Sequence, residues 1–253
     1  MKTFIISLLC ALVLPAVLVH ADGFELTDLN GDGTIRFLAF GDSITFGIGD
    51  TQGIGYPGRL ETMIGLLVDN EGDPGEVFLN TGVNRLGQLL QNSAADYVLL
   101  MEGANDARSH VDGAQMEVGF QKSINAAQAL GKTPILMTLP PPCCEHGGLT
   151  PSTESYGRVM LALGEENSIP VVNLRKAWIT TCTSIGECQL YNLPEGLHPN
   201  AQGYLVMAQT IAATLFNIDI FAEGGAADLE GALGLPEGTV IVKPEPAPAE
   251  ESN

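Results

Sequence analysis

Ser43 and His198 could act together as a nucleophile and its general base, although they lie near opposite ends of the chain. A serine hydroxyl needs a base to attack a carbonyl at neutral pH, and the tetrahedral intermediate needs hydrogen-bond donors for its oxyanion. Glu195, three residues before His198, could orient the imidazole, and the side-chain amide of Asn105 could donate to the oxyanion. Together these residues predict acyl transfer by an activated serine.

Two other histidines follow the N-terminal apolar run, His110 and His146. His110 is close to Asn105 in sequence and could line the pocket, or it could lie in a surface loop. His146 follows a pair of cysteines, where an exposed position is expected. His198 is favoured as the base because it directly precedes a predicted helix and has a carboxylate three residues away.

The elements between these residues must bring them together. Apolar runs alternate with segments of helical period, which predicts an α/β protein with a parallel sheet covered on both faces. The predicted strands span 35–40, 76–79, 97–101, 134–139 and 169–173, and the predicted helices span 58–68, 86–91, 114–130, 153–163 and 201–216. Functional groups gather at the carboxyl ends of parallel strands. We therefore expect Ser43, the cluster 80–87 and Asn105 to lie at one edge of the sheet.

Three short motifs resemble those of the SGNH (GDSL) hydrolases. They are Gly41-Asp42-Ser43, Gly103-Ala104-Asn105-Asp106 and His198-Pro199-Asn200, and the resemblance extends over residues 35–216. It implies a three-layer flavodoxin-like fold, with a five-stranded parallel sheet between helices, and ester hydrolysis through an acyl-enzyme. It also implies that Ser43 is the nucleophile and contributes its own backbone N–H to the oxyanion hole. Asn105 would be a second oxyanion donor and His198 the base.

The chain departs from the family pattern at two positions. Glu195 stands where the family usually has an aspartate; it could complete the triad, or it could be a solvated loop residue. Arg85 stands where the family's oxyanion glycine is expected, five residues after an asparagine such as Asn80. The backbone N–H of Arg85 could serve instead, or Gly82 or Gly87 could take the role through a local shift.

Asp42, Arg85 and His110 are the candidate substrate-binding residues. The Arg85 side chain could face the cleft and attract an acyl or sugar oxygen, or it could point to solvent. Asp42 could instead accept hydrogen bonds from loop amides. No metal or other cofactor is expected, because acyl transfer by a serine requires neither.

The chain divides into four predicted parts. Residues 1–21 have a basic start, an apolar run and a small-residue cleavage site, which is the pattern of a signal peptide; an uncleaved anchor helix is the alternative. Residues 22–33 form an N-terminal segment, in which 28–33 is similar to the start of a calcium loop but is expected to be a plain turn. The hydrolase domain spans 34–217. Residues 218–253, rich in Gly, Ala, Pro and Glu, are expected to be disordered or loosely docked.

Charge and cysteine content indicate the surroundings of the protein. Eleven basic and 30 acidic residues give a net charge of −19, which disfavours nucleic acid and anionic membranes as partners. No second apolar run is long enough to span a membrane. Four cysteines remain after cleavage, and we expect two disulfides joining the pair Cys143 and Cys144 to Cys182 and Cys188. A zinc site is the alternative. Signal peptide and cysteines together predict a secreted or periplasmic protein.

These observations predict a secreted serine esterase that hydrolyses short-chain carboxylic esters, with acetyl groups on carbohydrates as the preferred substrate class. A lysophospholipase or thioesterase would use the same catalytic groups. A catalytically silent binding module on the same fold is the third hypothesis.

Overall fold

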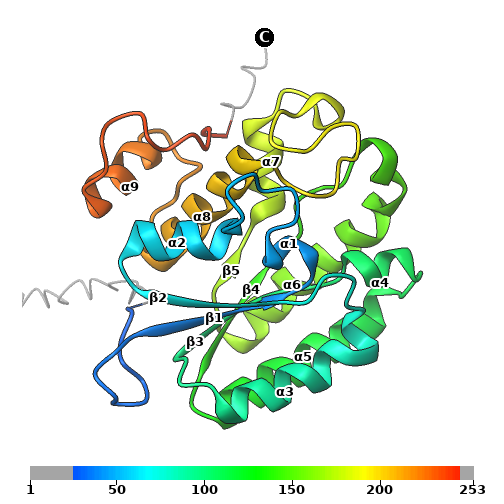
Figure 1. Ribbon diagram of the computed structural model, residues 1–253, viewed down its shortest axis with the longest axis vertical. Coiled ribbons are helices and arrows are strands. Elements are labelled where there is room, and N and C mark those ends of the chain that lie inside the picture. Colours follow the sequence, from blue (N-terminus) through cyan, green and yellow to red (C-terminus); the bar gives the residue numbers. More distant parts are fainter. Residues whose placement is uncertain (1–24, 246–253) are drawn as a thin grey trace, which may run out of the picture.

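A twisted parallel sheet runs through the centre of the computed structural model, which describes residues 25–245 (Figure 1). Its five strands lie in the order β2-β1-β3-β4-β5, and every neighbouring pair is parallel. This order is that of flavodoxin-like folds, so the predicted α/β fold with a five-stranded parallel sheet is confirmed. The strands are β1 (Arg36–Gly41), β2 (Leu67–Gly72), β3 (Tyr97–Met101), β4 (Thr133–Met137) and β5 (Val171–Val172).

Helices cover both faces of the sheet, and side chains alternate between the two cores. On β1, Phe37 and Ala39 join the cluster beneath α2, α7 and α8, whereas Leu38 and Phe40 join the cluster beneath α3, α5 and α6. The helices of the first layer are α2 (Gly55–Ile64), α7 (Leu174–Thr181) and α8 (Ala201–Leu215); those of the second are α3 (Val83–Asn92), α5 (Gly113–Ala129) and α6 (Thr150–Asn167).

The remaining helical elements are short or lie outside these two layers. They are α1 (Ser43–Phe46), the π-helical turn η1 (Phe78–Gly82), α4 (Ala104–Arg108), the 3₁₀ turns η2 (Cys144–Leu149) and η3 (Ile185–Glu187), and α9 (Gly225–Leu233). No helix within residues 25–245 is long and apolar enough to cross a bilayer. The predicted signal peptide at 1–21 lies outside the described residues.

The second strand is not where the sequence predicts it. Residues 76 and 77 precede η1 and residues 78 and 79 belong to it. The strand is β2, nine residues earlier, with the sequence Leu-Val-Asp-Asn-Glu-Gly. It is an edge strand, and only Val68 of its six residues is buried. An edge strand that buries one apolar side chain lacks the continuous apolar run by which inner parallel strands are identified. The helix predicted at 58–68 therefore includes the first two residues of β2.

The predicted disulfide pairing is also wrong. Cys182 and Cys188 are bonded to each other, and Cys143 and Cys144 are both free thiols. The segment between the bonded cysteines contains the short turn η3, which brings their Cα atoms to 5.3 Å, within the range that a disulfide spans. Cys143 is buried and Cys144 is exposed.

The segment after Asn217 is folded as far as the structure describes it, contrary to the expected disorder. Ile220, Leu229, Val240 and Val242 are at most 8% exposed and join the core cluster that contains α8. The side chain of Gln209 on α8 donates to Thr239 O and accepts from Ile241 N, so polar contacts also attach the segment. Gly, Ala and Glu are frequent between its four buried apolar residues. The average composition of the segment therefore does not indicate that it packs on the core.

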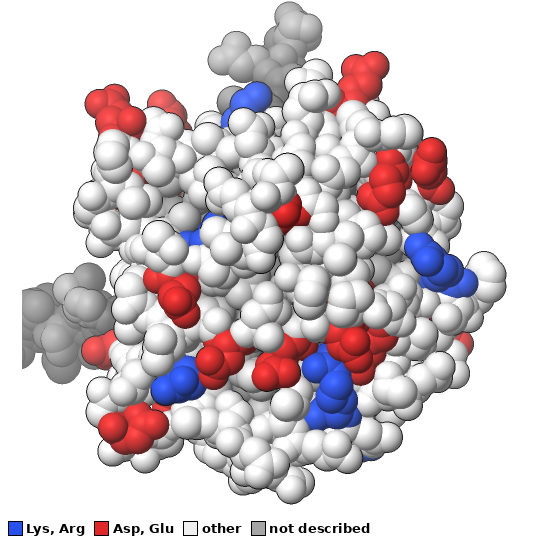
Figure 2. Space-filling view, in the orientation of Figure 1, with Lys and Arg blue, Asp and Glu red and all other residues white. Residues whose placement is uncertain are grey.

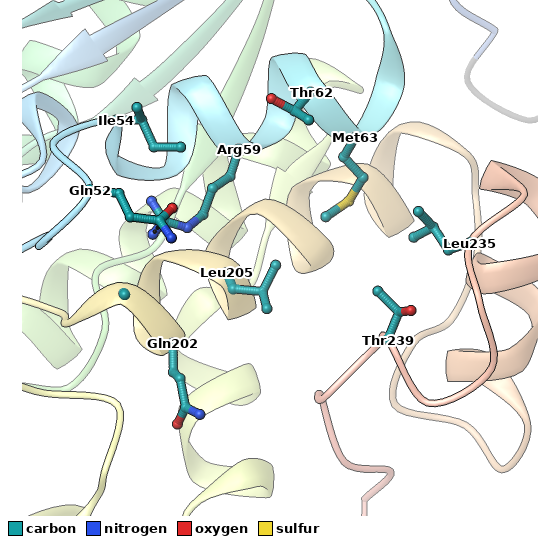
Figure 3. Close-up of a pocket in the computed structure, with 10 residues that line it drawn as sticks. Gln52, Ile54, Arg59, Thr62, Met63, Gln202, Leu205, Leu235 and Thr239 are labelled. Carbon is teal, nitrogen blue, oxygen red and sulfur yellow. Dashed lines mark hydrogen bonds between the residues drawn. The ribbon is translucent and has the colours of Figure 1, made fainter.

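Residues 235–239 also close one side of a cavity of about 480 Å³ between α2 and α8 (Figure 3). Met63 of α2 and Leu205 of α8 line it opposite Leu235 and Thr239. No candidate catalytic residue contributes to its wall. At the other end of the described chain, Asp28 accepts hydrogen bonds from Gly31 N and Gly33 N, so 28–33 is the expected turn.

Candidate active site

The nucleophile candidate lies where β1 ends. Asp42 caps the short helix α1 through a hydrogen bond from Ile44 N (2.9 Å), and Ser43 is the first residue of that helix. Gly41 permits this tight turn, because a Cβ there would lie 2.4 Å from Met101 O and 2.1 Å from Thr45 Oγ1. Gly41 pairs with Met101 at the end of β3, so the residues that follow both strands share one edge of the sheet.

Ser43, His198 and Glu195 are brought together by the structure. Ser43 Oγ lies 2.9 Å from His198 Nε2, and His198 Nδ1 lies 2.9 Å from Glu195 Oε1. With the imidazole proton on Nδ1, His198 donates to Glu195 and its Nε2 can accept the serine proton. The three side chains thus have the geometry of a nucleophile, a base and an orienting acid.

Glu195 is held in its ionised form. Its Oε2 accepts hydrogen bonds from the backbone amides of Leu197 (2.9 Å) and His198 (2.8 Å). Partial burial acts to raise the pKa of Glu195, but these amides, together with the nearby histidines, lower it below the usual value. The extra methylene relative to aspartate is accommodated because the carboxylate folds back onto the backbone of its own loop.

The loop that carries His198 is fastened to α8, and α8 is fastened to the segment after α1. Asn200 caps α8 by accepting from Gln202 N and Gly203 N, and its amide donates to Gln189 O and Tyr191 O. The Tyr204 hydroxyl donates to Ile48 O at 2.8 Å. These bonds place the imidazole beside Ser43, which is far away in sequence.

Asn105 lies on α4 at the same edge of the sheet. Its Nδ2 donates to Asp42 Oδ2 at 3.4 Å. This bond fixes the amide next to the turn at residues 41–43, which carries the candidate nucleophile and is called the nucleophile turn below. The neighbouring Asp106 accepts from Phe78 N and Leu79 N and attaches α4 to η1. Asp42 is fully buried. Its place is that of an internal acceptor for Ile44 and Asn105, and it presents no surface to a substrate.

Three candidate oxyanion residues lie in the helical segment η1–α3. Gly87 is the fifth residue of α3, where a backbone N–H bonds to the carbonyl four residues earlier. Gly82 ends η1 with its Cα facing Phe78 and Glu76. Arg85 is in the first turn of α3, and its guanidinium forms an ion pair with Glu76 and donates to Glu71 O and Gly41 O.

The Arg85 guanidinium also lies 4.0 Å from the centre of the Phe40 ring. It is thus engaged within the protein, beneath the nucleophile turn. His110 is an exposed residue after α4 and makes no hydrogen bond to Ser43, Glu195 or His198 in the described part of the chain. Neither side chain is joined to the triad.

A glycine that the sequence analysis missed lies beside the nucleophile turn. From Asn70, within β2, the chain reads Asn70-Glu-Gly72-Asp73-Pro-Gly75, so Gly75 stands five residues after an asparagine, as the family's oxyanion glycine does. Asp73 N donates to Gly41 O at 2.9 Å, which fastens this loop to the end of β1. Gly75 has φ +88°, is exposed and has open space around its Cα. The spacing of Asn70 and Gly75 can be identified only when β2 is placed at 67–72.

Buried carboxyl groups surround the base of the site. Burial, together with the charges of Asp106 and Glu76, raises the pKa of Asp42 to about 7. The hydrogen bond from Ile44 N acts in the opposite direction and lowers this pKa. Burial and the charge of Asp42 raise the pKa of Glu102 well above its usual value. Both groups therefore bind protons more tightly in the folded than in the unfolded chain.

We expect the protein to be less stable at pH 8 than at pH 5. Because the pKa of Asp42 is higher in the folded than in the unfolded chain, protonation of Asp42 increases the free energy of unfolding. This contribution is fully present below the unfolded pKa, near 4, and is lost as the pH rises through about 7. From Asp42 alone the loss between pH 5 and pH 8 is about 3 kcal/mol. Asp50, whose pKa is about 2, does not titrate in this window. Urea unfolding at both pH values measures the difference.

Asp42→Asn is the control for this expectation. The amide keeps an acceptor for Ile44 N, and its lost bond to Asn105 affects both pH values alike. The stability difference between pH 5 and pH 8 should therefore shrink in this variant. An unchanged difference would assign the pH dependence to other groups.

Comparison with known proteins agrees with this architecture. The family described as GDSL-like lipase/acylhydrolase matches residues 39–206. Similar solved structures include a lipolytic protein of the G-D-S-L family from Veillonella parvula DSM 2008, with 22% identity, a TM-score of 0.63 and coverage of 73% of this chain and 99% of that one. Another is the lipase/acylhydrolase from Enterococcus faecalis, with 24% identity, a TM-score of 0.60 and coverage of 70% and 93%.

A third similar structure is an acetylxylan esterase from Geobacillus stearothermophilus, with 19% identity, a TM-score of 0.59 and coverage of 72% of this chain and 94% of that one. Identities this low establish a shared fold. A search of curated proteins found no match.

Proposed function

Because the chain belongs to the GDSL-like lipase/acylhydrolase family, we propose that it hydrolyses carboxylic esters with Ser43 as nucleophile, His198 as general base and Glu195 as orienting acid. The observation that carries this proposal is the unbroken chain of contacts at 2.9 Å from Ser43 Oγ to His198 and from His198 to Glu195. Ser43 is the first residue of α1, Glu195 and His198 lie in the loop before α8, and all three side chains are partly accessible.

The reaction proceeds in two halves. His198 Nε2 takes the proton of Ser43 as Oγ attacks the ester carbonyl, and then gives that proton to the departing alkoxide, which leaves an acyl-enzyme. Water, deprotonated by the same nitrogen, attacks the acyl-enzyme; His198 then returns that proton to Ser43 Oγ as the acyl–oxygen bond breaks and the acid is released. Glu195 stabilises the imidazolium that exists in each half, and its lowered pKa keeps it negative at neutral pH.

Three donors are available for the oxyanion. The backbone N–H of Ser43 is in the first turn of α1, where no intrahelical acceptor exists. Asn105 offers the Nδ2 group that Asp42 holds in place. For the third we propose the Gly75 N–H, which makes no hydrogen bond to any described residue, in place of Arg85, Gly82 and Gly87.

Reaction with an organophosphonate tests the proposal directly. Only an activated serine reacts readily with such a reagent, so we expect one equivalent to be bound, and peptide mass spectrometry to locate it on Ser43. Failure of the folded protein to react would favour the catalytically silent binding module. Attachment at another serine would reject the nucleophile.

Acetyl esters of carbohydrates are the substrate class we propose. Similar structures include the acetylxylan esterase described above and a carbohydrate acetylesterase family member from Sinorhizobium meliloti. Acidic side chains are spread more widely than basic ones over the face shown in Figure 2, and the net charge of the chain is −19. Such a surface repels anionic lipid interfaces, whereas it neither attracts nor repels uncharged sugars. The Cys182–Cys188 disulfide and the sequence of residues 1–21 support action outside the cytoplasm.

A series of p-nitrophenyl esters tests the preference for short acyl chains. We expect kcat/KM to be highest for acetate and to fall by at least tenfold, or about 1.4 kcal/mol, for octanoate. Acetylated xylo-oligosaccharides should release acetate. Faster turnover of long-chain esters would favour the lysophospholipase alternative, and a matched pair of acetyl ester and acetyl thioester separates the thioesterase alternative.

A further inference from the structure

We propose that Arg108 and His146 extend the triad into a chain of five side chains, in which His146 positions Glu195. This inference rests on the proposed function. His146 Nδ1 lies 2.8 Å from Glu195 O and 3.3 Å from Glu195 Oε1, and Arg108 Nη2 lies 3.0 Å from His146 Nε2. The Glu195 residue is therefore contacted by an imidazole on each side, His198 and His146.

The arginine sets the direction of these hydrogen bonds. A guanidinium can only donate, so His146 Nε2 must accept and the imidazole must carry its proton on Nδ1. That proton can be donated only toward Glu195, whose carbonyl and carboxylate oxygens both lie on that side. The order of donation is Arg108 to His146 to Glu195, while His198 donates to the same Glu195 carboxylate from the triad side.

Backbone contacts hold the two loops against each other. Cys143 N donates to Gly196 O at 2.8 Å, and Glu145 N donates to Pro194 O at 3.3 Å. Gly196 has φ +74°, and a Cβ there would lie 2.6 Å from Cys143 O, so the two loops approach as closely as glycine allows. His146 thus forms one of three contacts between residues 143–146 and 194–196.

Arg108 connects this pair of loops to the other half of the site. It is the last residue of α4, and Asn105, the proposed oxyanion donor, is near the start of the same helix. The acid and the oxyanion donor are thereby linked through one turn of helix and one imidazole.

A glutamate at this position needs such support. It has one more rotatable bond than the aspartate usual in the family, and its side chain is 31% exposed. The backbone amides of Leu197 and His198 hold Oε2 and His198 Nδ1 contacts Oε1, which leaves the glutamate backbone and the far side of Oε1 to be held by a further contact. His146, whose side chain is 22% exposed, occupies that side.

The test measures kcat and KM for p-nitrophenyl acetate in three variants. His146→Leu should lower kcat about tenfold, or about 1.4 kcal/mol, with KM unchanged, because an acid that is poorly placed weakens the transition state more than substrate binding. His146→Asn, whose amide nitrogen stands near the Nδ1 position, should recover kcat to within about threefold of wild type. Arg108→Leu should lower kcat about threefold, whereas Arg158→Leu, an exposed arginine paired with Glu154 on α6, should not change it.

A double-mutant cycle with Glu195→Ala separates positioning from a general effect on the loop. The bond from His146 to Glu195 O involves the backbone and survives in this background, while the carboxylate is gone. His146→Leu should then have no further effect on kcat. An equal tenfold loss in both backgrounds would overturn the proposal, since His146 would then act on the His198 loop as a whole.

Full kcat in both His146→Leu and Arg108→Leu would also overturn the proposal. Because Arg108 is exposed, its variant keeps the test informative if His146→Leu does not fold. A wild-type protein that neither hydrolyses the ester nor reacts with the phosphonate would instead refute the proposed function itself.

Discussion

Ser43→Ala is expected to lower kcat for acetyl-ester hydrolysis by about 10⁴- to 10⁶-fold, because no covalent intermediate can form without the hydroxyl. The fold should be unaffected. The hydrogen bond to His198 is the contact that the Ser43 hydroxyl makes among the described residues, so its loss should change the free energy of unfolding by about 1 kcal/mol or less. Initial rates with p-nitrophenyl acetate and a urea unfolding curve measure the two quantities.

Two controls make the result specific to Ser43. Ser109→Ala, at an exposed serine directly after α4, should retain wild-type kcat. The double variant Ser43→Ala/His198→Ala should be no slower than Ser43→Ala alone, because the base has no function once its nucleophile is gone. More than a tenth of wild-type activity in Ser43→Ala would show that another group carries the reaction.

The inner part of the sheet and the residues that follow it could be predicted because their signals are strong. Residues 37–40 of β1 and all of β3 are continuous apolar runs, and each is followed within four residues by a polar residue of the site, Ser43 after β1 and Asn105 after β3. His198 and Glu195 were identified from a helix start and a three-residue spacing. These are local features, and a parallel sheet adds the rule that strand ends meet at one edge.

The edge strand and its loop could not be predicted, and the error spread to the site. β2 buries only Val68, so its sequence reads as the polar end of a helix. A second strand at 76–79 puts the family's asparagine at Asn80 and its glycine position at Arg85. The structure puts Arg85 in an ion pair with the buried Glu76 and leaves Gly75 exposed beside the nucleophile turn. Its family spacing becomes visible only when the strand is known.

Contacts between distant segments explain the other two misses. Two adjacent cysteines and two more about 40 residues later admit several pairings, and the turn η3 decides in favour of the local one. The positioning of Glu195 by His146 depends on residues 143–146 lying against 194–196, and no pattern within either segment indicates this contact. Sequence reasoning placed His146 on the surface, whereas the structure buries most of its side chain.

The C-terminal segment supplies the second large expected effect. Truncation after Asn217 removes four buried apolar side chains from the core that contains α8 and leaves the amide of Gln209 without its partners Thr239 and Ile241. It also removes Leu235 and Thr239, one wall of the cavity in Figure 3, and so exposes Met63 and Leu205. The triad residues themselves are all retained.

Leu229→Ala alone should lower the free energy of unfolding by about 2–5 kcal/mol, since the Leu229 side chain is fully buried. The truncated chain should lose at least that much, which for a domain of this size lowers Tm by about 5 °C or more. Differential scanning calorimetry measures both variants, and Leu161→Ala, at a leucine of α6 that is 43% exposed, is the matched control that should shift Tm by less than about 2 °C. If the truncated protein melted at the wild-type temperature, the segment would be an appendage and the core would be complete without it. A lower Tm with wild-type kcat at 20 °C would instead show that these residues stabilise the α8 layer, and that His198 at its N-terminal end keeps its place while the domain stays folded.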